Sequence, residues 1–184
     1  APPIFPNKSR LPEAVAARAA PLVPLLVPFP GWLAALAYPA SGMDLLENAV
    51  ESIRVGVEDF QAGTHARLLS AVRNIHAGIL LLYKEALRRM SPADSDEVLV
   101  KAKIVPALDA DGEVVFVGKG GRTADTYQIR ERFEALRIST DWKRFDTIGN
   151  ARNDVEHYYP KLNQQALQGV VASAFAIVRD FVAE

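Results

Sequence analysis

From Met43 onward, apolar residues recur every three and four positions, which is the spacing of one face of an α-helix. This pattern constrains the chain because a helix with one apolar stripe must bury that stripe against another element. Asp44 and Glu47 stand three positions apart, as in a capping box, so we expect the first helix to begin there and to end near Gly63. Its apolar positions are Leu46, Ala49, Val50, Ile53, Val57 and Phe60.

Four further helical segments follow the same spacing. We expect a long helix capped by Thr64 and running to Arg89, where Ser91-Pro92 ends it. The later segments are predicted over residues 125–138, 140–159 and 161–182.

The periodicity changes between the second and third helices. Residues 98–108 and 113–117 are rich in β-branched side chains and flank a turn at 109–112, so they predict a β-hairpin. We interpret the glycine-rich residues 118–123 as a flexible connector, because they lack the order of a nucleotide-binding phosphate loop. The sequence therefore predicts a mainly α fold, a helical bundle of four to five helices with a β-hairpin inserted near residues 98–118.

Residues 1–42 differ from the rest, since they hold nine of the twelve prolines. We expect the domain to span residues 43–184 and residues 1–42 to be a proline-rich leader or non-native segment. A secretory signal is a second interpretation, because two apolar stretches follow Arg18. Prolines at 24, 28 and 30 interrupt the first stretch, so neither a membrane span nor an ordinary signal core is predicted.

Charge and composition narrow the classes of function. The formal net charge is −1, so the chain has no overall cationic character of the kind that general nucleic-acid binders show. The absence of cysteine excludes disulfides and thiolate metal sites, and three histidines without a repeated spacing do not predict a zinc site. We therefore expect one domain without metal, cofactor or membrane, in the cytoplasm.

A compact run of polar residues near the carboxyl end holds the strongest candidate site. It reads Ala151-Arg152-Asn153-Asp154-Val155-Glu156-His157-Tyr158-Tyr159-Pro160. Asn153 and His157 are one helical turn apart and share a face, and the long side chain of Arg152 can curl toward that face. Arginine suits phosphate oxygens, and histidine exchanges protons near neutral pH. Such a patch can hold a phosphate and move a proton without metal.

The spacing Arg-Asn-x-x-x-His resembles the signature of the HEPN superfamily, and the resemblance extends over residues 43–182. It implies a helical bundle that pairs as a symmetric homodimer, with two copies of the motif meeting across the twofold axis. It also implies RNA as substrate and a role as a toxin or defence factor, with an antitoxin as a further partner in some branches.

The resemblance assigns catalytic roles to Arg152, Asn153 and His157. His157 would exchange the proton of a ribose 2′-hydroxyl or of the leaving 5′-oxygen, and Arg152 would stabilise charge on the phosphate. We expect Glu156 to tune His157, and Tyr158 or Tyr159 to stack on a base. Lys119 and Arg122 are further candidate contacts for the RNA backbone.

Other interpretations remain open. The alternative to the ribonuclease is a non-catalytic RNA- or protein-binding module. In one HEPN branch, a partner nucleotidyltransferase modifies a tyrosine two residues after the histidine. Tyr159 stands at that offset, so such a partner could regulate this chain. A helical interaction domain without catalysis is a third interpretation, in which His157 caps a helix end and Arg152 forms a surface ion pair with Glu156. His76 lies on the apolar stripe of the second helix, so we expect a hydrogen-bonded core histidine there, while its neighbours Arg73 and Asn74 could line a groove.

Overall fold

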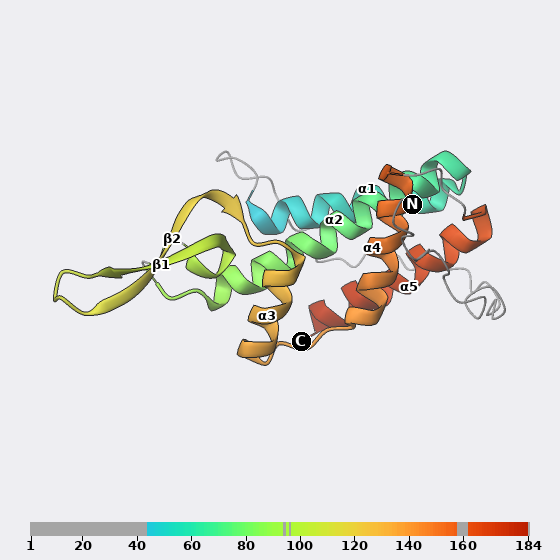
Figure 1. Cartoon of the computed structure of the whole chain (residues 1–184). Helices are drawn as coiled ribbons and strands as arrows, with labels where there is room; N and C mark the ends of the chain where they lie inside the picture. Colours follow the sequence, from blue (N-terminus) through green and yellow to red (C-terminus); the bar gives the residue numbers. More distant parts are fainter. Residues whose placement is uncertain (1–43, 94, 96, 158–161, 184) are drawn as a thin grey trace, which may run out of the picture.

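The computed structural model describes residues 44–93, 95, 97–157 and 162–183 (Figure 1). These residues form a helical bundle with one two-stranded antiparallel sheet, so the predicted mainly α fold with an inserted hairpin is confirmed. The elements are α1 (Leu45–Ala62), α2 (His65–Met90), the 3-10 turn η2 (Val98–Val100), β1 (Lys101–Leu108), β2 (Val114–Thr123), α3 (Thr126–Leu136), α4 (Trp142–His157) and α5 (Gln164–Ala183).

Helices α1 and α2 lie side by side and antiparallel (Figure 1). Their close approach depends on two glycines, because a β-carbon on Gly56 would lie 2.6 Å from Ile75 Cδ1 and one on Gly78 would lie 2.5 Å from Ile53 Cγ1. The buried carboxylate of Asp59 joins the two helices, since it accepts from Arg67 and Asn74 of α2. Asn74 is thereby engaged with α1.

The predicted start signals are confirmed at both helices. Glu47 N donates to Asp44 Oδ1 at 2.7 Å and Asp44 N donates to Glu47 Oε2 at 3.0 Å, which completes the capping box. Gly63 ends α1 in the left-handed region at φ 67°, and Thr64 accepts from Arg67 N to cap α2. Local sequence therefore determines where α1 ends and where α2 begins.

Helix α2 is the centre of the bundle, because α1, α3, α4 and α5 all pack against it. Its Tyr83 is 1 % exposed and stands in an aromatic cluster with residues of α3, α4 and α5. The phenol is paired with Thr140 Oγ1 at 2.8 Å, and burial raises the pKa of Tyr83 to about 12. The partners in the cluster are Phe133, Trp142, Phe145 and Phe181.

The hairpin extends away from one end of the bundle (Figure 1). Two details of the prediction are wrong. Residues 98–100 form the 3-10 turn, because Val100 N donates to Glu97 O at 2.7 Å and Lys101 N donates to Val98 O. Residues 118–123 belong to β2 and are no flexible connector, because Thr123 pairs with Lys101 across an irregularity in the register.

The two ends of the hairpin lie close together where it joins the bundle. Ala124 N donates to Val100 O at 2.8 Å, and Lys101 pairs with Thr123 beside this bond, so backbone contacts hold the two ends of the hairpin together. Gln128 of α3 donates to Ala102 O, and Lys84 Nζ of α2 donates to Thr123 Oγ1. These contacts anchor the base of the hairpin to α2 and α3.

Within the described residues, α5 is long and apolar enough to cross a membrane by length and composition, with a mean hydropathy of 1.5. In this fold one face of α5 is in the core, and 28% of its apolar window is buried inside the structure. Its buried positions are Leu167, Val170, Val171, Ala174 and Ile177. The predicted ends of the fourth and fifth helices at 159 and 161, and the proline-rich segment 1–42, lie outside the described residues.

Candidate functional site on helix α4

Buried residues spaced three apart fix the rotation of α4. Phe145, Ile148 and Ala151 face the core, which leaves the next residue, Arg152, at the edge of the helix. The N-terminal turn is capped, since Arg144 N donates to Asp141 Oδ1 at 2.9 Å. The sequence of α4 therefore presents the candidate motif on the outer side of the bundle.

Arg152 is held by two neighbours on its own helix. Its Nη2 lies 2.6 Å from Glu156 Oε2, and its Nη1 donates to Asn153 Oδ1 at 3.1 Å. The second bond draws the guanidinium toward the face that Asn153 shares with His157, as the side-chain length predicts. The ion pair with Glu156 is also the surface pair of the non-catalytic interpretation.

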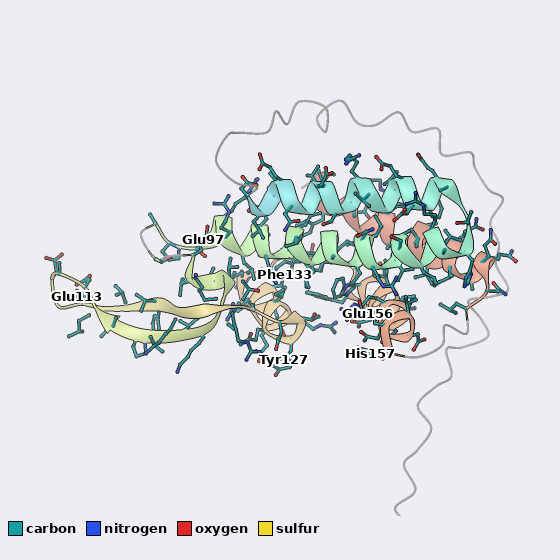
Figure 2. All side chains as sticks on the ribbon, turned by 90° about the horizontal axis from the view of Figure 1, so that it is seen from above. Glu97, Glu113, Tyr127, Phe133, Glu156 and His157 are labelled. Carbon is teal, nitrogen blue, oxygen red and sulfur yellow. The ribbon has the colours of Figure 1, made fainter. Side chains whose placement is uncertain are left out.

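His157 is the last residue of α4 and is exposed (Figure 2). Figure 2 shows Glu156 and His157 next to each other at this end of the helix. Asn153 is exposed as well, so both members of the predicted polar face are open to solvent. Tyr158 and Tyr159 lie outside the described residues.

Lys119 and Arg122 do not lie beside the motif on α4. Both are exposed on β2, and the tip of their hairpin at Glu113 lies far from His157 (Figure 2). The base of the hairpin reaches α2 at Lys84, next to Tyr83, which packs on Trp142 at the opposite end of α4 from His157. A single protomer therefore does not bring these two cations to the motif.

His76 of α2 joins the site beneath the motif. Its imidazole stacks on the ring of Phe145, with centroids 5.1 Å apart and planes at 25°, and its Nε2 lies 3.5 Å from where a β-carbon on Gly149 would be. Burial lowers the pKa of His76 to about 4; the charge of Arg152 adds to this effect and that of Glu156 opposes it. The ring is therefore neutral at pH 7.

The apolar stripe predicted a hydrogen-bonded core histidine at His76, and of this prediction the structure confirms only the inward direction of the ring. No residue in the described part of the chain forms a hydrogen bond with the imidazole, which packs by stacking instead. The sequence did not indicate that His76 lies against the motif helix, because that contact joins residues about 70 positions apart in the chain. Asn74 does not line the same groove, since its amide is bound to Asp59 and Ser70.

Two other features lie apart from the motif. A hollow between the α3–α4 connection and the end of α5 is lined by Asp141, Trp142 and Phe181 among others, at the opposite end of α4 from His157. In the ranges that the structure describes, no three side chains of histidine, aspartate or glutamate gather as metal ligands would.

Comparisons with protein-family models, with curated proteins and with solved structures find no match to this chain.

Proposed function

We propose that this protein is a metal-independent endoribonuclease and that Arg152, Asn153 and His157 of α4 form its reactive face. The observation that carries the proposal is the hydrogen bond from Arg152 Nη1 to Asn153 Oδ1 at 3.1 Å. This bond turns a permanent cation toward the exposed face on which Asn153 and His157 stand one turn apart.

The reaction class follows from these groups. His157 takes the proton of a ribose 2′-hydroxyl, the oxygen attacks the adjacent phosphorus, and the bond to the 5′-oxygen breaks. The leaving 5′-oxygen takes up a proton from the imidazolium of His157 or from solvent water, which balances the step. Arg152 stabilises the charge that grows on the phosphate oxygens, and Asn153 holds the guanidinium in place. The products are a 2′,3′-cyclic phosphate and a free 5′-hydroxyl. DNA lacks the attacking hydroxyl and is not a substrate.

The test is cleavage of end-labelled RNA in EDTA by four single variants. We expect His157→Ala and Arg152→Ala each to reduce the rate by about a hundredfold or more. His65→Ala removes another exposed histidine, and Arg144→Ala removes another arginine of α4, which is ion-paired to Asp141 just before the helix. Both controls should keep the rate of the unmodified protein.

These outcomes distinguish cleavage by this protein from cleavage by a contaminating ribonuclease. Circular dichroism should show that all four variants keep their helical content. Unchanged turnover of His157→Ala, or equal cleavage of an all-deoxy strand, contradicts the proposed chemistry.

The ion pair between Arg152 and Glu156 favours a second function. Because Glu156 already neutralises Arg152 at 2.6 Å, the same surface suits a non-catalytic RNA- or protein-binding module. In that case RNA binds without cleavage in EDTA, and removal of His157 changes affinity alone. A partner nucleotidyltransferase that modifies Tyr159 would add the mass of a nucleotide to the protein, which mass spectrometry detects. A toxin role predicts that expression of the unmodified protein arrests growth and that His157→Ala relieves the arrest.

The shared cleft of a symmetric homodimer belongs to the same proposal. Because the chain has no cysteine, Asn153→Cys provides a single thiol on the motif face. Two motifs that meet across a twofold axis would be joined by oxidation of this variant. Lys143→Cys, on an exposed position of the same helix, is the matched control.

A further inference from the structure

The hairpin of residues 101–123, here called the arm, leaves the bundle as an isolated pair of strands (Figure 1). A two-stranded hairpin gains little stability alone in water, and one with a solvated apolar side gains least. Three large apolar side chains of the arm are nevertheless open: Leu108 is 70 % exposed, Val114 64 % and Phe116 61 %. Such a surface is typical of an interaction site.

The register places these side chains on one face. Pro106 is opposite Phe116 and Leu108 is opposite Val114, at alternate positions of each strand. Because side chains two apart on a strand share a face, the four residues form one continuous patch, here called the apolar face. The residues between them face the other side, on which Lys103 is directly opposite Lys119.

Charge varies along the arm. The exposed tip carries three acids, Asp109, Asp111 and Glu113. Toward the base, Lys103, Lys119 and Arg122 are exposed, and none of them forms an ion pair with another residue that the structure describes. Like charges directly opposite each other on paired strands are destabilising, so the two lysines favour an acidic neighbour.

From this arrangement we infer that the arm is a homodimerisation element, in which the apolar faces of two copies pack against each other in antiparallel orientation. The twofold axis passes near Phe116, which lies midway along β2 between Glu113 at the acidic tip and Lys119. Each acidic tip then lies beside the basic base of the other arm, and the flexible stems of Lys103 and Lys119 carry their ammonium groups past the strand edge. In such an isologous contact, the acids at the tip and the cations at the base of each arm both lie beside opposite charges of the other arm.

The charge order favours a second copy over a nucleic acid. Three carboxylates at the tip repel phosphate, and the apolar face has no cation between its members to pair with a backbone. A parallel arrangement of two arms would bring the acidic tips together, so the antiparallel one is preferred. This inference does not depend on the proposed ribonuclease chemistry, and its twofold axis at the arm defines a different interface from the shared cleft proposed on α4.

The first test is sedimentation equilibrium of the full chain. We expect a dimer, and we expect Phe116→Glu to raise its dissociation constant at least about tenfold, because a central buried aromatic is replaced by a charge. The matched control is Val115→Thr, one residue away on the opposite face, which should leave the constant unchanged. Helical content should be equal in all three proteins, since the arm lies outside the bundle core.

A charge exchange tests the antiparallel order. Lys103→Glu combined with Lys119→Glu gives an arm that is acidic at both ends, and Asp109→Lys combined with Asp111→Lys gives one that is basic at both ends. Each double variant alone should dimerise weakly, whereas an equal mixture should form a heterodimer. The weakening should diminish at high salt.

A crosslink locates the axis. In this cysteine-free chain, Phe116→Cys should form a disulfide-linked dimer on oxidation, and Val115→Cys should not. A monomeric unmodified protein, a dimer that Phe116→Glu leaves intact, or equal crosslinking of the two cysteine variants overturns the inference. Loss of RNA binding by the lysine variants without a change of oligomeric state also overturns it, and assigns the arm to nucleic acid.

Discussion

Arg152 is ion-paired to Glu156, with 2.6 Å between guanidinium nitrogen and carboxylate oxygen one turn further along α4. The cation that the motif assigns to phosphate thus already has an anion beside it, and in the proposed function RNA would compete with that carboxylate for the guanidinium. Exposed pairs of this kind contribute about 0.2–1 kcal/mol, so the competition is weak enough for a polyanion to win.

Glu156→Gln should therefore strengthen RNA binding by up to about fivefold, because the neutral amide no longer competes for Arg152. Fluorescence anisotropy with a labelled RNA measures the affinity. Asp141→Asn is the matched control, since it frees Arg144 on the same helix in the same way. If Glu156→Gln instead abolishes cleavage while binding is kept, Glu156 takes part in the proton transfer itself.

The position of His76 predicts a loss of stability in mild acid. Its pKa is lowered to about 4 in the folded protein from an ordinary value of 6.5, so folding favours the neutral ring. The contribution, about 3 kcal/mol, is fully present above pH 6.5 and is lost as the pH falls toward 4, because the unfolded chain then binds the proton more readily. Urea unfolding across this range should show a shallower decline for His76→Gln than for the unmodified protein. His65→Gln, which alters an exposed histidine, should keep the full decline.

Two glycine-to-alanine substitutions should change the stability of the fold in opposite directions. Gly78→Ala places a β-carbon 2.5 Å from Ile53 Cγ1 and 3.1 Å from Ala49 O, and overpacking of about 1–3 kcal/mol outweighs the helix propensity gained. Gly169→Ala on α5 meets no atom within 4 Å and should stabilise by up to about 1 kcal/mol. Thermal unfolding measures both. A stabilised Gly78→Ala variant would mean that α1 and α2 are further apart than described.

Tyr83→Phe tests the buried phenol. The variant loses the hydrogen bond to Thr140 and should be about 1 kcal/mol less stable at neutral pH. In the unmodified protein the raised pKa of about 12 means that the contribution of Tyr83 is complete below pH 10 and is lost as the pH rises toward 12. The difference between the two proteins should therefore shrink or reverse in alkali. Tyr127→Phe, at an exposed phenol of α3, should change stability by less than about 0.5 kcal/mol.

Features set by neighbouring residues could be predicted from the sequence. The capping box of Asp44 and Glu47 is contained in four positions, and the inward direction of His76 follows from the spacing of Val72 and Ile79 around it. The curl of Arg152 toward Asn153 is likewise a local matter of side-chain length.

Features that join distant segments could not be predicted. The strand character of residues 118–123 depends on pairing with β1, and glycines alone indicate flexibility. The stacking of His76 on Phe145 depends on how α4 crosses α2. The place of Lys119 and Arg122 depends on the direction in which the arm leaves the bundle, which no turn residue encodes.

The hydrogen bond between Ala124 N and Val100 O, beside the pair of Lys101 and Thr123, has an evolutionary consequence. Because the chain leaves the bundle and returns to it at neighbouring residues, the intervening hairpin can be lengthened, shortened or exchanged in one genetic step while the bundle keeps its hydrophobic core. Selection can therefore remodel this projecting surface independently of the surface that α4 presents, and paralogues within one cell can come to differ in the first while keeping the second.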